Sequence, residues 1–272
     1  MNSYADIALL KSKLGVTGTT LDAELLTLAI AASREIDAQA GRVFYVIENE
    51  ARVFDGSTGG VLLIDDLLSA SEVATDVDGD ESYGDTWAEG TEYVLEPRTT
   101  FPKTALRVHL DEHDMTLGRG RRLYFRITGN WGAGDMKSAT PWRDGGFLLT
   151  AADDTTTSVT LSSGDYVSPG MTIRCDEEQM FVESVAGTAA TVIRGVNNTE
   201  SDAHTSEAVS FAQYPETVVN ATAWLAASFW REFASAGYES ERIGDYSYKM
   251  AAGNRTATVL SRLVNSVRRR PV

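Results

Sequence analysis

The side chains that could bind a metal ion lie in two short clusters. The first holds His109 and His113, separated by a leucine and two acidic residues. Histidines four positions apart share a face only on a helix, and alternating apolar residues over 105–110 predict a strand instead. In the acidic run at 76–81, the glycine comes two positions too early for an EF-hand calcium loop, and Trp87 stands where the final glutamate belongs. The histidine cluster is therefore predicted to be an exposed turn and the acidic run a hairpin loop, with weak surface binding of a cation left open for the acidic run.

The residues that could perform catalysis form no recognisable motif. The sequence GSTGG at 56–60 is followed by neither Lys-Ser/Thr nor a helix pattern, so it does not predict a phosphate-binding loop. No Ser, His and Asp stand in a nucleophile motif. Carboxylates are numerous, so a pair suited to glycoside hydrolysis stays open, but no context singles one out. We therefore expect no enzyme, no cofactor and no metal.

Cysteine content and apolar runs restrict the class of protein further. Cys175 is the only cysteine, which excludes an intramolecular disulfide and a Cys-cluster metal site, and it is expected to be a small buried apolar residue. No run approaches the roughly 18–20 apolar residues of a membrane span. The first residues show no signal-peptide pattern, so no secretion signal is predicted. With 272 residues, of which 43% are hydrophobic, the chain can form one large domain or two small ones.

The charge of the chain is large and unevenly distributed. The formal net charge is −15. Residues 215–272 hold 8 basic and 5 acidic residues, a formal charge of +3, and the remaining 16 basic and 34 acidic residues give −18. An acidic surface argues against wrapping a nucleic acid. It remains compatible with a channel through which DNA slides without sticking.

Hydrophobic periodicity predicts an α+β fold in which a small helical bundle packs with an antiparallel β-sheet. Helices are predicted at 4–14 and from a capping Thr19 or Thr20 to Ala40, with Gly15 and Gly41 as their stops. From Val43 the period changes to two, and turn signals separate the strands. These strands are predicted at 43–48, 51–55, 61–64, 71–77, 91–95, 105–110 and 121–128.

A second β-rich block follows a linker at 133–146 and is predicted to be an inserted all-β domain, with a barrel or a sandwich left open. It shows no helix signals, and it lies between a Gly-rich linker and Pro215. Its strands are predicted at 147–150, 157–161, 171–175, 179–185, 189–194 and 208–212. The predicted domains are thus 1–140 (first part of the core), 141–213 (insert) and 214–272 (second part of the core).

The helix predicted from Pro215 to Phe233 is apolar on two faces, so it must be covered twice. One face is predicted to pack in the core. The other, with Val218, Leu225 and Phe229, is predicted to contact a neighbouring subunit, and burial inside the chain's own core is the alternative. Contacts between subunits are also predicted for Tyr246 and Tyr248, in a short alternating segment. A last helix then leads to three consecutive arginines at 268–270.

Three pieces of sequence in order resemble one known family. They are DAQAGRVF (37–44) followed at once by strands, TGNWG (128–132), and the Pro215 helix followed by IGDYS (243–247) and a basic end. Together they resemble the head–tail connector (adaptor, or head-completion) proteins of tailed phages, over about residues 4–132 and 215–272. The chain departs from that pattern in the eighty or so residues between Gly132 and Pro215, where a few would be usual.

The insert has a resemblance of its own, to a small β module found among phage structural proteins. The matching pieces are MTIR (171–174), EQMFV (178–182), TVIRG (191–195), Asn198-Thr199 and His204. In that module Gly-Thr normally follows the Arg-Gly turn, and a glycine follows the histidine. Here Asn198-Thr199 and Glu207 stand instead, and the role of the insert stays open.

The connector resemblance implies a ring of about twelve subunits in the neck of the virion, under the portal, with the subunits made in the host cytoplasm. Such a ring would extend the DNA channel and offer a docking surface for neck or tail-completion proteins, without sequence-specific DNA binding. It implies that the C-terminal segment reaches the portal, where Arg262, Arg268, Arg269 and Arg270 would meet acidic residues or carbonyls. A solvated tail is the alternative for these arginines. The rival functions are a tail-completion or surface β-module protein that binds a host glycan, and an acidic secreted hydrolase.

Overall fold

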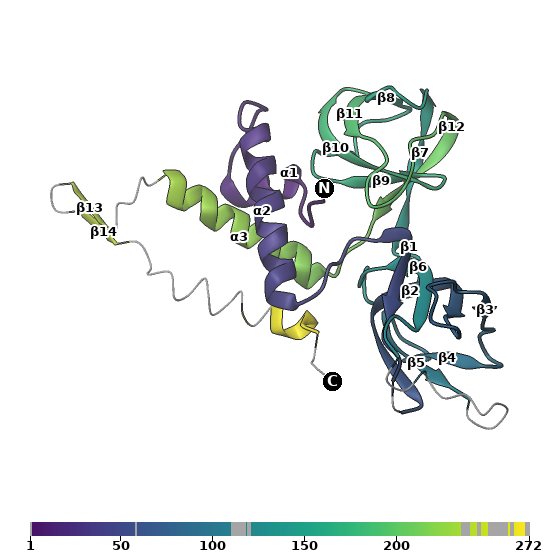
Figure 1. Ribbon diagram of the computed structural model, residues 1–272. Helices are drawn as coiled ribbons and strands as arrows, with labels where there is room; N and C mark the ends of the chain where they lie inside the picture. The colour runs from purple at the N-terminus through teal and green to yellow at the C-terminus, as the bar shows by residue number, and fades with distance from the viewer. Residues whose placement is uncertain are drawn as a thin grey trace.

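The computed structural model combines a helical core, an antiparallel sheet and a closed β-barrel (Figure 1). It describes residues 2–57, 59–109, 118, 121–234, 240–243, 246–249, 261 and 264–269. Figure 1 shows the helices on one side of the molecule, with the barrel and the sheet stacked beside them. The expected mixture of α and β structure, with an antiparallel sheet and a separate all-β unit, is confirmed at this level, and the all-β unit is a barrel. In the described part of the chain, no helix is both long and apolar enough to cross a membrane.

Three helices form the helical core. They are α1 (Ile7–Leu14), α2 (Asp22–Ala40) and α3 (Glu216–Ala234). Gly15 and Gly41 end the first two in the left-handed conformation, at φ 68° and 65°, as predicted. The predicted cap at Thr19 or Thr20 is wrong: the N-cap of α2 is Leu21, which makes no side-chain capping bond. The acidic residues in its first turn, Asp22 and Glu24, favour this helix end through its dipole.

The helical core joins the two ends of the chain. α3 packs against α1 and α2, and the buried side chains of Val264 and Val267 belong to the same hydrophobic cluster. This cluster is separate from the one inside the sheet. The helices and the sheet therefore have separate hydrophobic cores. The prediction that the bundle packs with the sheet had implied one shared core.

The antiparallel sheet has the strand order β1-β6-β2-β5-β4, with β3 paired to β2. Its strands are β1 (Ile47–Phe54), β2 (Val61–Thr75), β3 (Asp85–Thr86), β4 (Tyr93–Glu96), β5 (Lys103–Val108) and β6 (Phe125–Trp131). Two predicted pairs of strands are each one continuous strand: 43–48 with 51–55 became β1, and 61–64 with 71–77 became β2. Register shifts interrupt the ladders of both strands, and these irregularities break the alternation that the prediction relied on.

The TGNWG sequence forms the most crowded part of the sheet. A Cβ on Gly129 would lie 2.1 Å from the Ser69 carbonyl oxygen, and one on Gly132 (φ 128°) would lie 2.1 Å from the Tyr45 carbonyl oxygen. Between them Trp131 is fully buried and donates its indole N–H to the Glu50 carbonyl at 2.8 Å. The glycines are therefore required where neighbouring backbones pass directly against β6.

The barrel is continuous in sequence and its two ends leave it together. Its closed order is β10-β11-β8-β7-β12-β9. The strands are β7 (Trp142–Ala152), β8 (Ser158–Leu161), β9 (Thr172–Cys175), β10 (Glu178–Ala186), β11 (Ala189–Ile193) and β12 (His204–Ala212). Because β7 pairs with β12 and the Gln213 N–H donates to the Pro141 carbonyl at 2.8 Å, the barrel interrupts the path from β6 to α3 at a single point.

A buried network of hydrogen bonds holds the barrel on the rest of the chain. Gln179 is fully buried, and its Nε2 donates to the Val46 carbonyl and to the Glu48 carboxylate, each at 3.1 Å. The Gln179 Oε1 accepts from Asn197 at 2.7 Å, and Asn197 also exchanges hydrogen bonds with Asn2. The barrel, the start of β1 and the N-terminal segment therefore meet in one polar contact.

Asn198 explains one departure from the β-module pattern. It has a φ of 68°, in the left-handed region where glycine is favoured and asparagine is tolerated. Its side chain donates to the Glu48 carbonyl at 2.7 Å, a bond that glycine could not make. Asparagine therefore fits this turn and adds a contact to the sheet.

We expect Gly132→Ala to lower the free energy of unfolding by roughly 2–4 kcal/mol, because the new methyl group meets a backbone carbonyl and the backbone is strained. Urea unfolding followed by tryptophan fluorescence measures the effect. Gly84→Ala is the matched control, because a Cβ there meets nothing within 4 Å and its φ is not in the left-handed region. Equal stability of the two variants would contradict the crowding at Gly132.

Candidate functional site

The candidate functional site is the place where the C-terminal arginines meet the end of α2. Residues 264–267 are helical, and the backbone N–H of Arg269 donates to the Ala40 carbonyl at 2.9 Å. Of the four predicted portal-docking arginines, Arg268 is exposed and Arg269 is half-buried, whereas Arg262 and Arg270 lie outside the described residues. The sequence therefore located the segment, and the structure adds the surface on which it lies.

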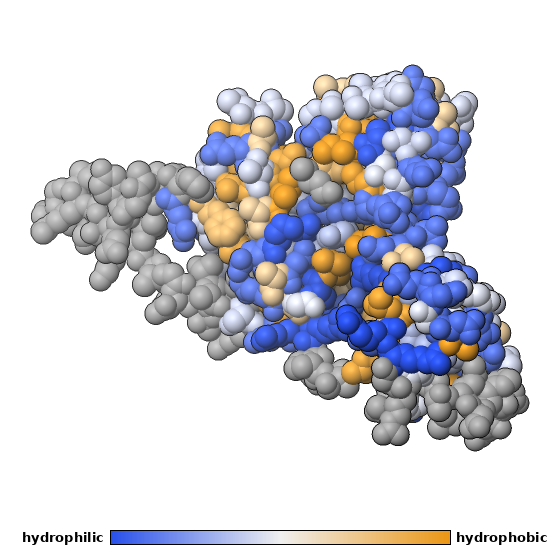
Figure 2. All heavy atoms as spheres, viewed as in Figure 1, coloured by the Kyte–Doolittle hydropathy of each residue, from blue (hydrophilic) through white to orange (hydrophobic). Residues whose placement is uncertain are grey.

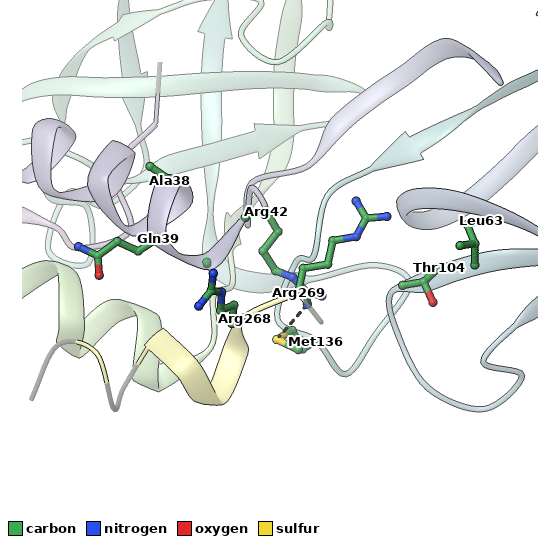
Figure 3. A pocket seen from close by; sticks show the side chains of 10 residues that line it. Ala38, Gln39, Arg42, Leu63, Thr104, Met136, Arg268 and Arg269 are labelled. Atoms are coloured by element: carbon green, nitrogen blue, oxygen red, sulfur yellow. Dashed lines mark hydrogen bonds between the residues drawn. The ribbon is translucent and has the colours of Figure 1, made fainter. Parts of the chain in front are cut away.

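A cleft of about 740 Å³ opens at this point. Residues from α2, the sheet, the linker and the C-terminal segment line it: Ala38, Gln39, Ala40, Gly41, Arg42, Leu63, Thr104, Met136, Arg268 and Arg269. Figure 3 shows Arg42, Arg268 and Arg269 close together, with Leu63 and Thr104 on the opposite side. In Figure 2, strongly hydrophilic side chains run across the junction between the helices and the sheet. Three of the lining side chains thus carry positive charge, and most of the other lining residues are apolar or small.

Arg42 is the buried charge of the cleft. Its Nε lies 3.2 Å from an Asp66 carboxylate oxygen, and both side chains are less than a tenth exposed. Burial raises the pKa of Asp66 and lowers that of Arg42, and the charge of each partner opposes both shifts. The second oxygen of Asp66 is buried without a hydrogen-bond partner among the described residues. Such a pair is costly to break, because one uncompensated charge would remain buried.

Arg269 is already bound within its own chain. Its guanidinium makes an ion pair with Asp65 at 3.0 Å and donates to the Ile64 carbonyl at 2.7 Å. Asp65 also pairs with Arg52 at 3.1 Å, and Arg52 lies over the Trp131 ring. Any contact of Arg269 with a portal, which stays a prediction, must first replace these bonds.

The last turns of α2 carry a second buried polar group. The Tyr4 hydroxyl donates to Asp37 and accepts from the backbone N–H of Phe44, and Arg34 pairs with Asp37 at 3.0 Å. Burial raises the pKa of Asp37 to about 6, although the Tyr4 hydrogen bond and the Arg34 charge lower it. The DAQAGRVF sequence is thus explained by this junction: its aspartate and its phenylalanine backbone hold the same tyrosine.

Two of the three α3 residues predicted to contact a neighbouring subunit are buried in the chain's own core. Val218 and Leu225 are 1% and 7% exposed inside the chain's own helical core, and Phe229 is half-buried against it. Neither Val218 nor Leu225 is therefore free to contact a second subunit. Trp224, at 44% exposed, is the large apolar side chain that α3 presents to solvent. Tyr246 and Tyr248 both lie on β14 (Tyr246–Lys249), which pairs with β13 (Ser240–Ile243). The structure does not describe their side chains.

Of the two rejected metal clusters, only the acidic run forms the predicted loop; His109 is half-buried and continues the pairing of β5 with β4, so the exposed turn predicted there is wrong. His109 follows β5 and its backbone N–H donates to the Glu92 carbonyl, whereas His113 lies outside the described residues. In the acidic run, the Asp76 carboxylate accepts backbone N–H groups from Gly79 and Glu81 and so closes the loop itself. Local hydrogen bonding therefore accounts for the aspartate at this loop.

The sequence analysis missed a buried charge cluster in the barrel. Glu178, Arg194 and His204, all within the quoted module pieces, lie together there. Arg194 donates both Nε and Nη2 to Glu178, each at 2.6 Å, and His204 Nε2 lies 2.8 Å from it. Burial raises the pKa of Glu178, but the hydrogen bonds from Arg194 and His204 outweigh it and hold that pKa below its usual value. The signal that could have found this cluster was the occurrence of all three residues in the quoted pieces.

No protein-family model matches this chain, and no curated protein sequence matches it either.

We expect Asp65→Asn to release the C-terminal segment, because it removes the charged partner of Arg269. Amide hydrogen exchange over residues 264–269 should become about two- to fivefold faster, the effect of losing about 0.5–1 kcal/mol of a part-exposed ion pair. Mass spectrometry of the corresponding peptide measures it. The control is Glu72→Gln, which removes the comparable Arg126–Glu72 pair on the sheet. Equal exchange in the two variants would show that Asp65 does not hold the segment.

The raised pKa of Asp37 predicts a pH dependence of stability. The Asp37 carboxyl group binds its proton more tightly in the folded chain than in the unfolded chain. The protonated Asp37 therefore stabilises the fold below about pH 4, and this stabilisation is lost as the pH rises through about 6. Relative to Asp37→Asn, the free energy of unfolding of the wild type should fall by up to about 3 kcal/mol over this window. Urea titrations at a series of pH values measure the difference. Glu35→Gln, on the exposed side of the same helix, should keep the wild-type slope, and a wild-type slope in Asp37→Asn would disprove the assignment.

Proposed function

We propose that this protein is a structural component of a tailed-phage virion: a head-to-tail adaptor that forms a ring under the portal. The observation that carries the proposal is the meeting of the C-terminal arginines with the end of α2. There the DAQAGRVF, TGNWG and C-terminal pieces of the connector resemblance come close together, as Gly132 and Ala133 donate backbone hydrogen bonds to Asp66 and Val43, and Arg269 donates to Ala40. Pieces far apart in the sequence thus supply one surface, which supports a shared role in binding.

The portal contact in this proposal begins at Arg268. This residue is exposed at the mouth of the cleft, and beside it Arg269 is held by Asp65. An acidic portal segment entering the cleft would meet Arg268 first and then compete with Asp65 for Arg269. Because the bond to Asp65 is half-exposed and therefore weak, such an exchange costs little. Arg42 is excluded from this exchange by its burial against Asp66.

The ring contact between subunits is proposed for the solvent side of α3. Trp224 is the exposed apolar side chain there, and Val218 and Leu225 are excluded because they are buried. In this proposal the ring has about twelve copies, surrounds passing DNA without reading its sequence, and lies in the neck of the virion. The net charge of −15 supports a channel that repels DNA instead of retaining it.

The barrel is proposed as part of the docking surface for a neck or tail-completion protein. Its contact through Gln179 and Asn198 is buried and hydrogen-bonded to Val46 and Glu48, so it is held firmly against the sheet. A rigid attachment would present the barrel in the same orientation on every subunit. This role is non-enzymatic and requires no cofactor.

The proposal is tested by electron microscopy of the protein mixed with the portal protein encoded in the same genome. A ring beneath the portal supports it. Portal assemblies without a ring would overturn it, and glycan binding or glycan hydrolysis by the isolated protein would then favour a host-binding β-module protein or a hydrolase.

We expect Arg268→Glu to weaken binding to the portal at least tenfold, because a loss of about 1.4 kcal/mol per contact corresponds to that factor and the ring repeats the contact. Surface-immobilised portal measures the affinity. Arg122→Glu is the control, since it makes the same charge change at an exposed position in the loop before β6. Equal portal affinity of the two variants would exclude Arg268 from the portal contact, but it would leave the proposal of a ring unchanged.

A further inference from the structure

Three metal-ligating side chains of different chemistry meet at the seam of the barrel. Cys175 ends β9, and His204 and Glu207 lie on the neighbouring strand β12. One ligand atom from each, the thiol sulfur, a ring nitrogen and a carboxylate oxygen, lies within 4.8 Å of the other two. Cys175 and His204 are buried, whereas the Glu207 side chain is 30% exposed. The cluster therefore has two buried donors and one donor at the surface.

The distances fit a site that a cation could occupy with small side-chain movements. His204 Nδ1 lies 2.7 Å from the Glu207 carboxylate, and Cys175 Sγ lies 3.8 Å from the same oxygen. Around a tetrahedral Zn²⁺, bond lengths of about 2.0–2.3 Å separate neighbouring ligand atoms by roughly 3.3–3.8 Å. The nitrogen and the oxygen need to part by about 0.6 Å or more to reach the separation that such an ion requires.

The buried cluster behind His204 prepares it as a ligand. Its Nε2 faces Glu178, whose carboxylate is already held by Arg194 and by the backbone N–H groups of Gly195 and Asp202. A carboxylate only accepts hydrogen bonds, so Nε2 keeps its proton. Nδ1 can then bind a metal once the proton that it shares with Glu207 is lost. Metal-binding histidines are oriented by carboxylates in this way.

The backbone of β12 is bent so that Glu207 reaches the same side as His204. In a regular strand, residues three apart point to opposite faces. Here Ser206, between them, has a φ of 62°, and both Thr205 and Ser206 are exposed. A non-glycine residue in this conformation costs energy and is typical of functional sites. The strained residue brings the carboxylate beside the imidazole.

We propose that Cys175, His204 and Glu207 bind a divalent transition metal of the Zn²⁺ type. A thiolate, a neutral imidazole and a carboxylate are the ligands that Zn²⁺ accepts, and their two negative charges balance its charge. On binding, the thiol proton and the proton between Nδ1 and Glu207 pass to solvent. The ion would join β9 to β12, and its fourth position would face the exposed side of Glu207.

Cobalt provides a direct probe of this site. Co²⁺ bound to a thiolate absorbs in the near ultraviolet through sulfur-to-metal charge transfer, and because Cys175 is the only cysteine, such a band can come from no other residue of the protein. We expect the wild type to show one band that saturates at one Co²⁺ per chain and disappears on addition of Zn²⁺. We also expect Zn²⁺ to raise the unfolding temperature, because it binds the folded state. Absence of the band in the wild type would overturn the proposal.

Two variants separate a built site from metal bound to a thiol alone. Cys175→Ser should lose the cobalt band and the stabilisation by Zn²⁺, and circular dichroism checks that its barrel is folded. Glu207→Gln should weaken Zn²⁺ binding about tenfold or more in competition with a chromophoric chelator. Glu183→Gln, which removes an exposed carboxylate from β10, should leave the affinity unchanged. Equal Zn²⁺ affinity of the two glutamate variants, or Zn²⁺ stabilisation that persists in Cys175→Ser, would refute the three-ligand site.

Discussion

The packing of α3 against α1 and α2 is the interaction on which the rest of the structure depends. It joins helices from the two ends of the chain and buries apolar faces that neither end can cover alone. It also requires the chain to leave β6 and return at Pro215 near the same place. The barrel satisfies this requirement because β7 and β12 are paired and Pro141 is hydrogen-bonded to Gln213, so a unit with its own core fits between two parts of another.

The sequence predicted the elements well where one local signal decided them. Gly15 and Gly41 end their helices because the left-handed conformation is cheapest for glycine, and α3 begins directly after Pro215. It failed where distant contacts decide. β1 and β2 each read as two strands because irregular register disturbs the alternation, and a periodicity of two cannot show that the partner strand compensates. Similarly, α2 begins at Asp22 without the expected hydroxyl cap.

At the candidate site, too, the sequence could not predict contacts between residues that are far apart in the chain. Periodicity established that α3 has two apolar faces, but it could not tell which chain covers them; the structure places Val218 and Leu225 in a cluster with Val264 and Val267 of the same chain. The charge of the C-terminal segment was likewise evident, yet its intramolecular partner was not. Asp65 lies about two hundred residues before Arg269, at a distance in sequence where no spacing rule applies.

The barrel is attached by a different kind of interaction from the one that holds the helical core together. Apolar faces hold the helices, whereas hydrogen bonds from Gln179, Asn197 and Asn198 hold the barrel. Apolar contact tolerates sliding, but a buried hydrogen-bond network has one satisfied arrangement, and each lost bond leaves a buried group unpaired. The hydrogen bonds therefore fix the orientation of the barrel relative to the sheet. Asn198 contributes to this orientation directly, because it adopts the left-handed conformation of its turn and also binds the sheet.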